Sequence, residues 1–304
     1  MIKVIYIAGW GRSGSTLIDG ILGHTPGLVS VGEIKFIWER GFLQNRRCSC
    51  GERFLECPFW TDAVRRGLPN VDESQIRALE AASRRTRTRH LPAMLLPGSS
   101  ERYGRDLEWY RSTLVDLYRG VLEAGHGDVI VDSSKFPSYA FLLHQTGQID
   151  LRVIHLVRDP RAVAFSWRRD KIDPDAPGGE RMKKLPSGVT GLYWSAWNFA
   201  IEKISRAQGI PRMLVRYEDF VSKPRATMEE IARWTGIEDR PLPFVSDNQV
   251  RLGPTHAVSG NAIRFDRGDI RITVDDGWFR EMGRGARVAA WASSWPTRRR
   301  YGYA

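Results

Sequence analysis

The strongest constraint on the fold lies at the start of the sequence, where an apolar run leads directly into a glycine-rich turn and a helical pattern. The run is Ile2–Ala8, the turn spans residues 9–16 (GWGRSGST), and apolar side chains then recur at helical spacing over residues 15–22. A turn of this kind directs backbone N–H groups toward an anion, and the N-terminus of the helix adds partial positive charge. The segment therefore predicts a buried first strand that ends in a phosphate-binding loop.

The spacing of the turn is that of a Walker A loop with one change. Four residues separate Gly9 from Gly14, and Ser15 stands where a nucleoside triphosphatase has lysine. That lysine contacts the β- and γ-phosphates, and the hydroxyl after it, here Thr16, holds Mg²⁺. A ligand with one 5′-phosphate and a terminal sulfate has less charge and no triphosphate chain, so Ser15 and the cation of Arg12 would suffice to bind it. The alternative is an ordinary Gly/Ser turn without a ligand.

Apolar runs and helical patterns alternate after this loop. Strand-like runs lie at residues 28–31, 128–131, 151–157 and 212–217, and helical patterns lie at 74–89, 107–124, 160–169, 193–207 and 223–235. Strands that are apolar on both faces and alternate with helices form parallel sheets covered on both sides. We expect an α/β, P-loop NTPase-like three-layer fold, with helices flanking a central parallel sheet. Because we find no internal repeat and no long linker, we expect residues 1–304 to form a single domain.

Two regions have no clear periodicity. Residues 170–190 contain the Pro and Gly clusters typical of a long loop, which is either a lid over an acceptor substrate or a disordered segment. From residue 240 onward no helical or strand pattern is clear.

The balance of charge favours an anionic partner. The chain has 46 Lys and Arg against 35 Asp and Glu, a net charge of +11. The basic runs at 84–89 and 298–300 lack the interleaved aromatic residues of nucleic-acid modules, so we expect no nucleic-acid partner. No run approaches the roughly 20 apolar residues of a membrane span, and the first run has no basic leader, so we expect no membrane span and a cytoplasmic protein.

The three cysteines, Cys48, Cys50 and Cys57, are an odd number in one short window, unlike a disulfide framework. A structural zinc ion needs four ligands, and no histidine lies near these cysteines in the sequence. We therefore expect a packed cysteine cluster and no metal.

A second candidate anion site follows the run at 151–157. Arg158 comes at the carboxyl end of this strand, Pro160 is suited to open the next helix, and Ser166 lies within that helix. Ligands of parallel sheets bind at the carboxyl ends of the strands, and arginine holds phosphate through charge-assisted hydrogen bonds. Arg158 and Ser166 are thus candidates for a second phosphate.

Four motifs in this order resemble those of the sulfotransferases that use 3′-phosphoadenosine 5′-phosphosulfate (PAPS). They are residues 12–16 (RSGST), 157–161 (VRDPR) with Ser166, 216–220 (RYEDF), and 259–261 (SGN) with Arg264. The first loop is similar to that of the bacterial, carbohydrate and tyrosylprotein enzymes. The resemblance implies that PAPS is the co-substrate and that its binding residues are Arg12, Ser13, Gly14, Ser15, Thr16, Arg158, Ser166, Tyr217, Gly260, Asn261 and Arg264.

The resemblance also implies the catalytic residues. Gly32 and Glu33 are similar to a Gly-Glu pair that supplies the general base in the tyrosylprotein branch, and Lys135 is similar to an assisting lysine. Glu33 would accept the proton of the acceptor hydroxyl, while Lys135 and Arg12 would stabilise charge on the leaving oxygen, without a metal. Otherwise, Glu33 complements the dipole of a helix at residues 35–40, and Lys135 is a surface lysine paired with Asp132 or Asp159.

Other functions remain open at this point. A P-loop nucleotide kinase or hydrolase is the first alternative, although the missing Walker lysine argues against it, and a non-catalytic nucleotide-binding module is the second. His24 and His155 are better explained by a helix end and by core packing, whereas His256 lies near Gly260 and is a further candidate contact for nucleotide or acceptor. The acceptor hydroxyl could belong to a carbohydrate, a lipid, a peptide tyrosine or a secondary metabolite.

Overall fold

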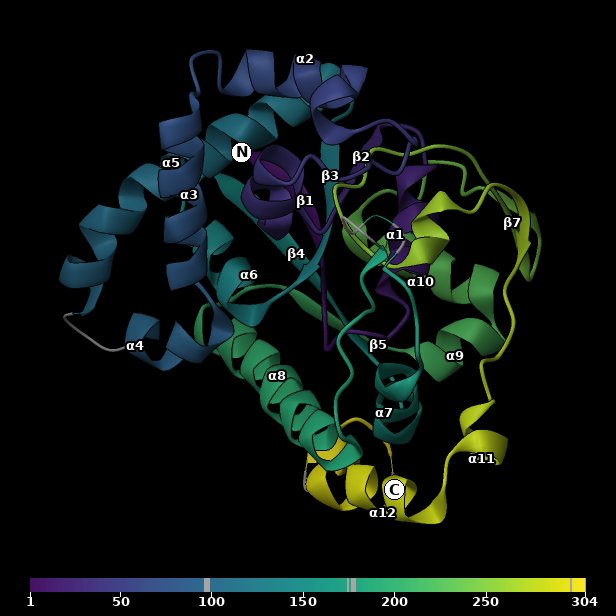
Figure 1. Cartoon of the computed structure of the whole chain (residues 1–304). Coiled ribbons are helices and arrows are strands. Elements are labelled where there is room, and N and C mark those ends of the chain that lie inside the picture. The colour runs from purple at the N-terminus through teal and green to yellow at the C-terminus, as the bar shows by residue number, and fades with distance from the viewer. Residues whose placement is uncertain (96–98, 174, 176–178, 296, 304) are drawn as a thin grey trace.

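The core of the protein is a five-stranded parallel sheet in the order β2-β3-β1-β4-β5 (Figure 1). The computed structural model describes residues 1–95, 99–173, 175, 179–295 and 297–303. The strands of this sheet are β1 (Ile2–Ala8), β2 (Leu28–Gly32), β3 (Val129–Lys135), β4 (Ile149–Val157) and β5 (Arg212–Arg216). All five were predicted from the apolar runs, with ends that differ by a few residues.

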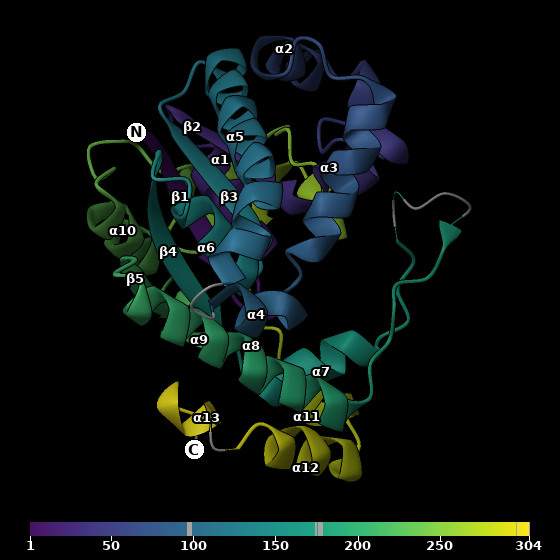
Figure 2. The same ribbon diagram turned by 90° about the vertical axis from the view of Figure 1, so that its left-hand side faces the viewer.

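Helices cover both faces of the sheet, because side chains of the central strand alternate between two apolar clusters. Val4 and Tyr6 pack on one side with α5 and α6, and Ile5 and Ile7 pack on the other with α1 and α10. Figures 1 and 2 show these layers. The predicted three-layer, P-loop NTPase-like fold is therefore confirmed. The α-helices up to α10 are α1 (Ser15–Gly23), α2 (Pro58–Gly67), α3 (Glu73–Arg85), α4 (Leu91–Leu95), α5 (Ser99–Gly125), α6 (Pro137–His144), α7 (Pro160–Arg168), α8 (Ser187–Ala207), α9 (Tyr217–Ser222) and α10 (Pro224–Thr235).

The strand register brings the carboxyl ends of the strands together at one edge of the sheet. Ala8, the last residue of β1, pairs with Lys135 on β3 and with His155 on β4. On the outer strands, Gly32 pairs with Asp132, and Val157 pairs with Arg216. The segments that follow β1, β2, β4 and β5 therefore begin close together, and they carry four of the motifs found in the sequence.

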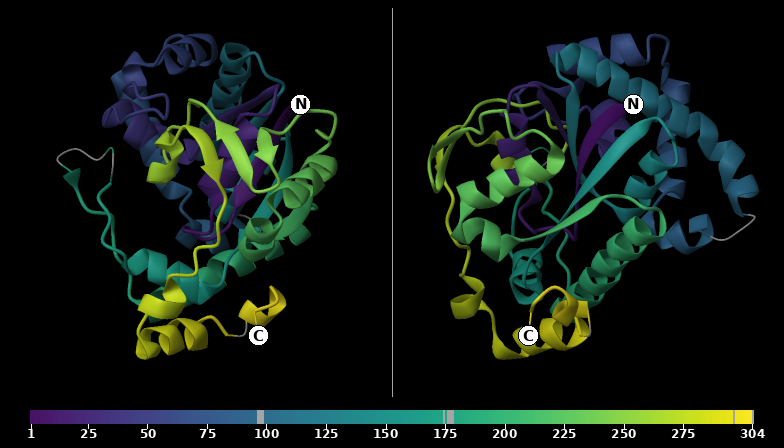
Figure 3. Two further views of the ribbon diagram at one scale, coloured as in Figure 1. Left: turned by 90° about the vertical axis from the view of Figure 1, so that its right-hand side faces the viewer. Right: turned by 180° about the vertical axis from the view of Figure 1, so that it is seen from behind.

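The region after residue 240 is more regular than we predicted. It contains a three-stranded antiparallel sheet and a group of short helices that packs against α7 and α8 (Figure 3). These elements are β6 (Phe244–Ser246), β7 (Gln249–Leu252), η6 (Ala262–Phe265), β8 (Gly268–Arg271), α11 (Trp278–Glu281), α12 (Arg284–Ser293) and α13 (Thr297–Arg300). Strands of three or four residues that are partly exposed are too short to give a clear period.

Two other segments depart from the sequence prediction. The helix expected at residues 35–40 is a 3₁₀ turn, η1 (Ile34–Phe36), followed by a π-helix, η2 (Ile37–Leu43). The loop expected at 170–190 ends earlier, because α8 begins at Ser187. Within it, Ile172 and Arg181 form an antiparallel bridge, and Figure 2 shows the segment projecting from the helical layers. Residues 174 and 176–178 of this loop lie outside the described residues.

Two further 3₁₀ turns are η3 (Phe54–Glu56) and η4 (Thr88–His90). Among the residues that the structure describes, no helix has the length and apolar character needed to cross a membrane.

One lysine of the core is buried at the end of a helix. Lys35 is 5% exposed, and its Nζ donates to the Ser83 carbonyl at 3.4 Å and to Thr86 Oγ1 at 3.2 Å, in the last turn and at the C-cap of α3. Burial lowers the pKa of Lys35 to about 7. The Ser83 carbonyl also accepts from the Thr86 hydroxyl at 2.8 Å, so it keeps a partner if the lysine is removed.

We therefore expect Lys35→Met to raise the free energy of unfolding at neutral pH by about 1–3 kcal/mol. The folded pKa lies below the unfolded value of about 10.4, so between the two the unfolded state binds more protons and the wild type gains stability as pH rises. The advantage of the variant should shrink toward pH 10. Denaturant unfolding over this range, with the exposed Lys3→Met as control, measures both effects. A variant less stable than wild type at pH 7 would contradict the expectation.

Candidate active site

The predicted phosphate loop connects β1 to α1 and depends on two glycines. A Cβ at Gly9 would lie 2.2 Å from the Leu156 carbonyl oxygen, and one at Gly14 would lie 2.6 Å from the Tyr217 ring. Gly14, at φ 93°, caps α1, and its carbonyl accepts from Leu17 N at 3.1 Å. Ser15 begins the helix, with Thr16 after it, and the Ser13 hydroxyl donates to the Trp10 carbonyl at 2.7 Å. The loop has the shape expected of an anion-binding turn.

The second anchor lies directly against this loop. Arg158, 6% exposed, donates from Nη1 to the Arg12 carbonyl at 3.3 Å, and its guanidinium lies 4.3 Å from the centre of the Tyr217 ring. The same ring contacts the loop at Gly14, as described above. Three motifs that are far apart in the sequence are thus in direct contact. Ser166 is buried in α7, which follows Arg158.

The last motif covers the start of α1. Asn261 N donates to Thr16 Oγ1 at 3.4 Å, and Arg264 donates from Nη1 to the Gly260 carbonyl at 2.9 Å. Arg264 is 6% exposed on η6. The structure therefore gathers the first loop and the motifs at Arg158, Tyr217 and Gly260 at one edge of the sheet.

Glu33 and Lys135 form a largely buried ion pair beside the loop. Glu33 follows β2, Lys135 ends β3, and Lys135 Nζ bonds Glu33 Oε1, with the side chains 13% and 14% exposed. The sequence left open a pairing of Lys135 with Asp132 or Asp159, and a role for Glu33 in complementing a helix dipole. Lys135 pairs with Glu33 instead, and Asp159 pairs with Arg161. Glu33 stands at the N-cap of the 3₁₀ turn η1, without a capping hydrogen bond from its side chain.

The charge state of Glu33 is set by its neighbours. Burial raises its pKa, but the charges of Lys135 and Arg40 outweigh burial and lower the pKa below its usual value. Arg40, on the π-helix η2, also donates to the Ser259 hydroxyl and so connects Glu33 to the last motif. Glu33 is therefore a carboxylate at neutral pH, held between cations.

Backbone strain marks the same place. In the described part of the chain, the non-glycine residues with positive φ are Arg12, Asn45, His126 and Lys135. Side chains other than glycine adopt this conformation at some cost, and such residues cluster at functional sites. Lys135 ends β3, and Arg12 lies in the loop that follows the neighbouring strand β1, where Gly9 N donates to the Lys135 carbonyl at 3.4 Å.

Aspartates from two loops pair with the candidate phosphate-binding arginines. Asp175, in the loop before α8, contacts Arg264 at 2.5 Å, and Asp275, before α11, contacts Arg158 at 3.0 Å. Arg264 and Asp175 have side chains only 2% and 4% exposed. Burying a cation without a counter-charge is costly, so these carboxylates stabilise the two buried arginines.

An aromatic group borders the loop on the side of α8. Trp10 stacks on Trp167 and Tyr193 with ring centres 5.7 and 5.4 Å apart, and Trp197 donates from Nε1 to the Lys135 carbonyl at 3.0 Å. Trp194 is fully buried and bonds the Arg158 carbonyl at 3.0 Å. Trp194 is core, whereas Tyr193 is 48% exposed.

The three candidate histidines, His24, His155 and His256, form their side-chain hydrogen bonds with residues outside the four motifs. His155 is fully buried in β4 and lies 3.0 Å from Asn198 Oδ1, and burial lowers its pKa to about 4. His24 follows α1, where its Nδ1 lies 2.7 Å from the Gly20 carbonyl and its Nε2 accepts from Gly253 N at 2.6 Å. His256 lies among the cysteines.

Sequence reasoning missed several of the polar residues at this edge. Arg40, Asp175 and Asp275 bear directly on candidate residues, yet each lies outside the recognised motifs. The π-helix that carries Arg40 has no distinct sequence period, and the aspartates pair with residues about 90 to 120 positions away. No local signal in the sequence identifies such partners.

Comparisons with solved structures find sulfotransferases at low similarity. The sulfotransferase domain of the Synechococcus PCC 7002 olefin synthase is 22% identical, with 78% of this chain and 74% of that chain covered and a TM-score of 0.42. The sulfotransferase domain from the curacin biosynthetic pathway is 20% identical, with 91% of this chain and 89% of that chain covered and a TM-score of 0.48. The sulfotransferase STF1 of Mycobacterium tuberculosis H37Rv is 13% identical, with 78% of this chain and 68% of that chain covered and a TM-score of 0.40.

No curated protein matches the sequence. A family model described as the sulfotransferase family, however, matches residues 5–241. This range runs from β1 through α10 and includes the first loop, Glu33, Lys135, Arg158 and Tyr217, but not Gly260. Because the match extends over more than half of the chain, the protein belongs to the sulfotransferase family.

Proposed function

We propose that this sulfotransferase moves the sulfuryl group of PAPS to a hydroxyl acceptor, with Glu33 as the general base. The observation that carries the proposal is the contact of four separate motifs at one sheet edge, next to a carboxylate–lysine pair. PAPS carries anionic groups at two ends, and Arg12 in the first loop and Arg158 against that loop would supply a cation for each.

The donor would lie across the first loop. The backbone of residues 12–16 and the hydroxyls of Ser15 and Thr16 would bind the 5′-phosphosulfate at the start of α1. Arg158 and Ser166 would bind the 3′-phosphate, with Gly260, Asn261 and Arg264 closing over the nucleotide. The Nε atoms of Arg158 and Arg264 are buried without a hydrogen-bond partner, so each guanidinium keeps a donor that a phosphate oxygen could accept. The Tyr217 ring would support both Arg158 and the loop.

Transfer would be an in-line displacement at sulfur. The acceptor oxygen forms the new S–O bond as its proton passes to Glu33, and the bond from sulfur to the bridging oxygen breaks. Adenosine 3′,5′-bisphosphate leaves with the bonding electrons, and Lys135 and Arg12 stabilise the charge on the departing oxygen. The ion pair keeps Glu33 deprotonated and aims Lys135 at the same edge, so the chemistry does not require a metal.

The acceptor is a carbohydrate, lipid, peptide tyrosine or secondary-metabolite hydroxyl. Incubation with PAPS labelled in the sulfuryl group and a panel of such compounds, followed by mass identification of the product, tests the proposal directly. Label transfer to a hydroxyl supports it. Turnover of ATP with no use of PAPS would replace it with the kinase or hydrolase alternative.

Arg158→Ala should weaken binding of adenosine 3′,5′-bisphosphate by about 2 kcal/mol or more, close to 30-fold, because a charge-assisted contact in a buried site is lost. Isothermal titration calorimetry measures the change. Arg168→Ala is the matched control, since Arg168 is exposed at the end of α7, the helix that follows Arg158. Equal affinities for Arg158→Ala and wild type would refute the assignment of the 3′-phosphate.

Glu33→Gln should lower kcat by about 10²–10⁴-fold while nucleotide affinity changes little, because only proton transfer is lost. Glu39→Gln, on the neighbouring π-helix, serves as control. Since the charges of Lys135 and Arg40 lower the pKa of Glu33, its titration should limit kcat/KM only at a pH below the usual range of a glutamate. Full activity of Glu33→Gln would move the general base to another residue.

Asp175→Asn should tighten binding of adenosine 3′,5′-bisphosphate, because Arg264 loses the carboxylate that competes with a phosphate. An effect of about 1 kcal/mol corresponds to roughly fivefold. Asp170→Asn is the control, since Asp170 pairs with Arg181 and Lys184 within the same loop. Weaker binding in Asp175→Asn would show that the pair with Arg264 helps to hold the nucleotide.

A further inference from the structure

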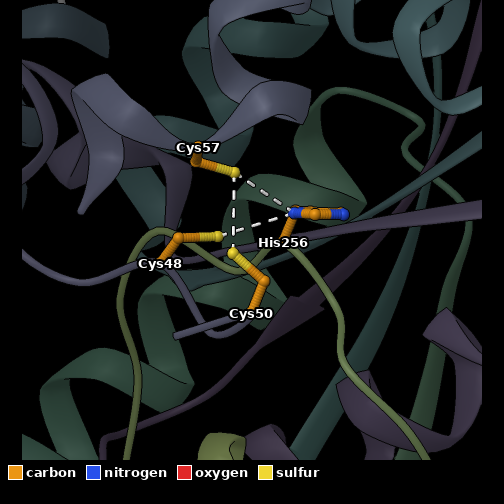
Figure 4. A group of neighbouring side chains, drawn as sticks. All are labelled: Cys48, Cys50, Cys57 and His256. Atoms are coloured by element: carbon orange, nitrogen blue, oxygen red, sulfur yellow. Dashed lines mark hydrogen bonds between the residues drawn. The ribbon is translucent and has the colours of Figure 1, made fainter. Parts of the chain in front are cut away.

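A cluster of three thiols and one imidazole lies apart from the proposed transfer chemistry. The potential ligand atoms of Cys48, Cys50, Cys57 and His256 all lie within 4.8 Å of one another (Figure 4). Cys48 and Cys57 are buried, and Cys50 is partly buried. The cysteines come from the segment between η2 and α2, while His256 comes from the segment between β7 and η6.

The distances in this cluster match the edges of a tetrahedral zinc site. Cys48 Sγ and Cys57 Sγ lie 3.7 and 3.4 Å from His256 Nδ1, and the sulfurs of Cys50 and Cys57 are 3.7 Å apart. Zinc bonds of about 2.3 Å to sulfur and about 2.0–2.1 Å to nitrogen, at tetrahedral angles, separate two sulfurs by about 3.8 Å and sulfur from nitrogen by about 3.6 Å. These three distances fit one ion at the centre of the four ligand atoms, and the other distances are at most 4.8 Å.

Hydrogen bonding alone accounts poorly for this arrangement. Cys48 and Cys57 both approach the same nitrogen, His256 Nδ1, which has one lone pair when it is an acceptor. Thiols are also weak donors. One cation bound to all four groups would satisfy the three sulfurs and the nitrogen together.

The backbone around the cluster fixes its members before any ion binds. Cys48 N donates to the Glu52 carbonyl at 2.8 Å, which forms a tight turn around Cys50. The indole of Trp60 donates to the His256 carbonyl at 2.8 Å. The His256 ring is stacked on Phe59 with centres 4.4 Å apart and planes 12° apart, which orients Nδ1 toward the sulfurs.

Hydrogen bonds at Ser49 join the two segments beside the cluster. Ser49 N donates to the Ala257 carbonyl at 3.1 Å, and Ala257 N donates to Ser49 Oγ at 2.8 Å. Both segments are therefore held in register where the thiols meet the imidazole.

We propose that Cys48, Cys50, Cys57 and His256 form a structural zinc site. Three thiolates and one neutral imidazole are a common ligand set for structural zinc, and four protein ligands leave no open position for catalysis. The sequence alone argued against a metal, because it shows three cysteines with no nearby histidine. The fold supplies the fourth ligand from about 200 residues away.

The zinc would connect the segment between η2 and α2, which carries the cysteines, to the segment between β7 and η6, which carries His256. Ser259 and Gly260 follow His256 within a few residues. The Ser259 carbonyl accepts a hydrogen bond from Glu33 N at 3.3 Å. The ion would therefore support the segment that covers the start of α1. The site itself does not depend on the proposed donor or acceptor.

Metal analysis of the purified chain tests the proposal. After chelator-free purification and gel filtration, mass spectrometric elemental analysis should find about one zinc per chain. Blocking the thiols with an organomercurial should release this zinc to a chromogenic chelator. Replacement by Co²⁺ should give the intense d–d bands of a tetrahedral ion and thiolate charge-transfer absorption. These measurements use the intact wild-type protein, so they do not depend on the folding of a variant.

Variants identify the ligands. Cys57→Ser and His256→Ala should each lower the zinc content at least several-fold after dialysis against a weak chelator, whereas His256→Cys should retain zinc with a four-sulfur cobalt spectrum. His126→Asn is the matched control, because His126 is exposed and its positive φ of 49° suits asparagine.

Three results would overturn the proposal. One is a wild-type chain without stoichiometric metal and with three titratable thiols. Another is a mass two hydrogens below that of the reduced chain, which would show a disulfide in place of the site. The third is bound iron with visible absorption, which would refute zinc as the resident metal.

Discussion

The pairing of β1 between β3 and β4 is the constraint on which the candidate site depends. Ala8 at the end of β1 is in register with Lys135 on one side and His155 on the other. Neighbouring strands lie about 4.8 Å apart, so the first residues beyond each strand are within one or two side-chain lengths of one another. Glu33, Lys135, Arg12 and Arg158 meet because parallel strands end at one edge, although they lie far apart in the sequence.

This edge gathers more positive charge than the fold can leave unpaired. Arg158 and Arg264 are nearly buried, and each has an aspartate partner from a loop that is not part of the sheet. Desolvated cations without counter-charges are costly, so the two loop aspartates stabilise the buried arginines. In the proposed function, the phosphates of the donor would replace these aspartates as partners. The Glu33–Lys135 pair differs, since both members belong to the ends of sheet strands. Each member of this pair is positioned by a strand of the sheet, whereas the aspartates of the other two pairs are positioned by loops.

Local patterns explain which parts could be predicted from the sequence. The five strands are short apolar runs, and α1, α7 and α10 carry an apolar helical period, so the layers of the fold were correctly predicted. The spacing of the glycines after β1 also predicted the turn between β1 and α1, whereas its binding of phosphate stays a prediction. The antiparallel strands β6, β7 and β8 are too short to show a period. Arg40 lies on a π-helix, whose irregular backbone has no sequence signature, and it approaches Ser259 only through the tertiary fold. The same holds for Asp175, Asp275 and His256, whose partners are set by chain packing and not by spacing.

The segment from β7 to η6 shows how such long-range contacts act together. It has little regular structure, yet Val258 N donates to the Val31 carbonyl at 3.0 Å, and Asn261 N donates to Thr16 Oγ1. A loop joined by a few bonds retains considerable conformational freedom, and each further cross-link to distant parts of the chain reduces that freedom. A metal bond at His256 would anchor the segment just before the residues that approach α1. The positions of Gly260 and Arg264 would then depend in part on a zinc site that takes no part in the transfer reaction.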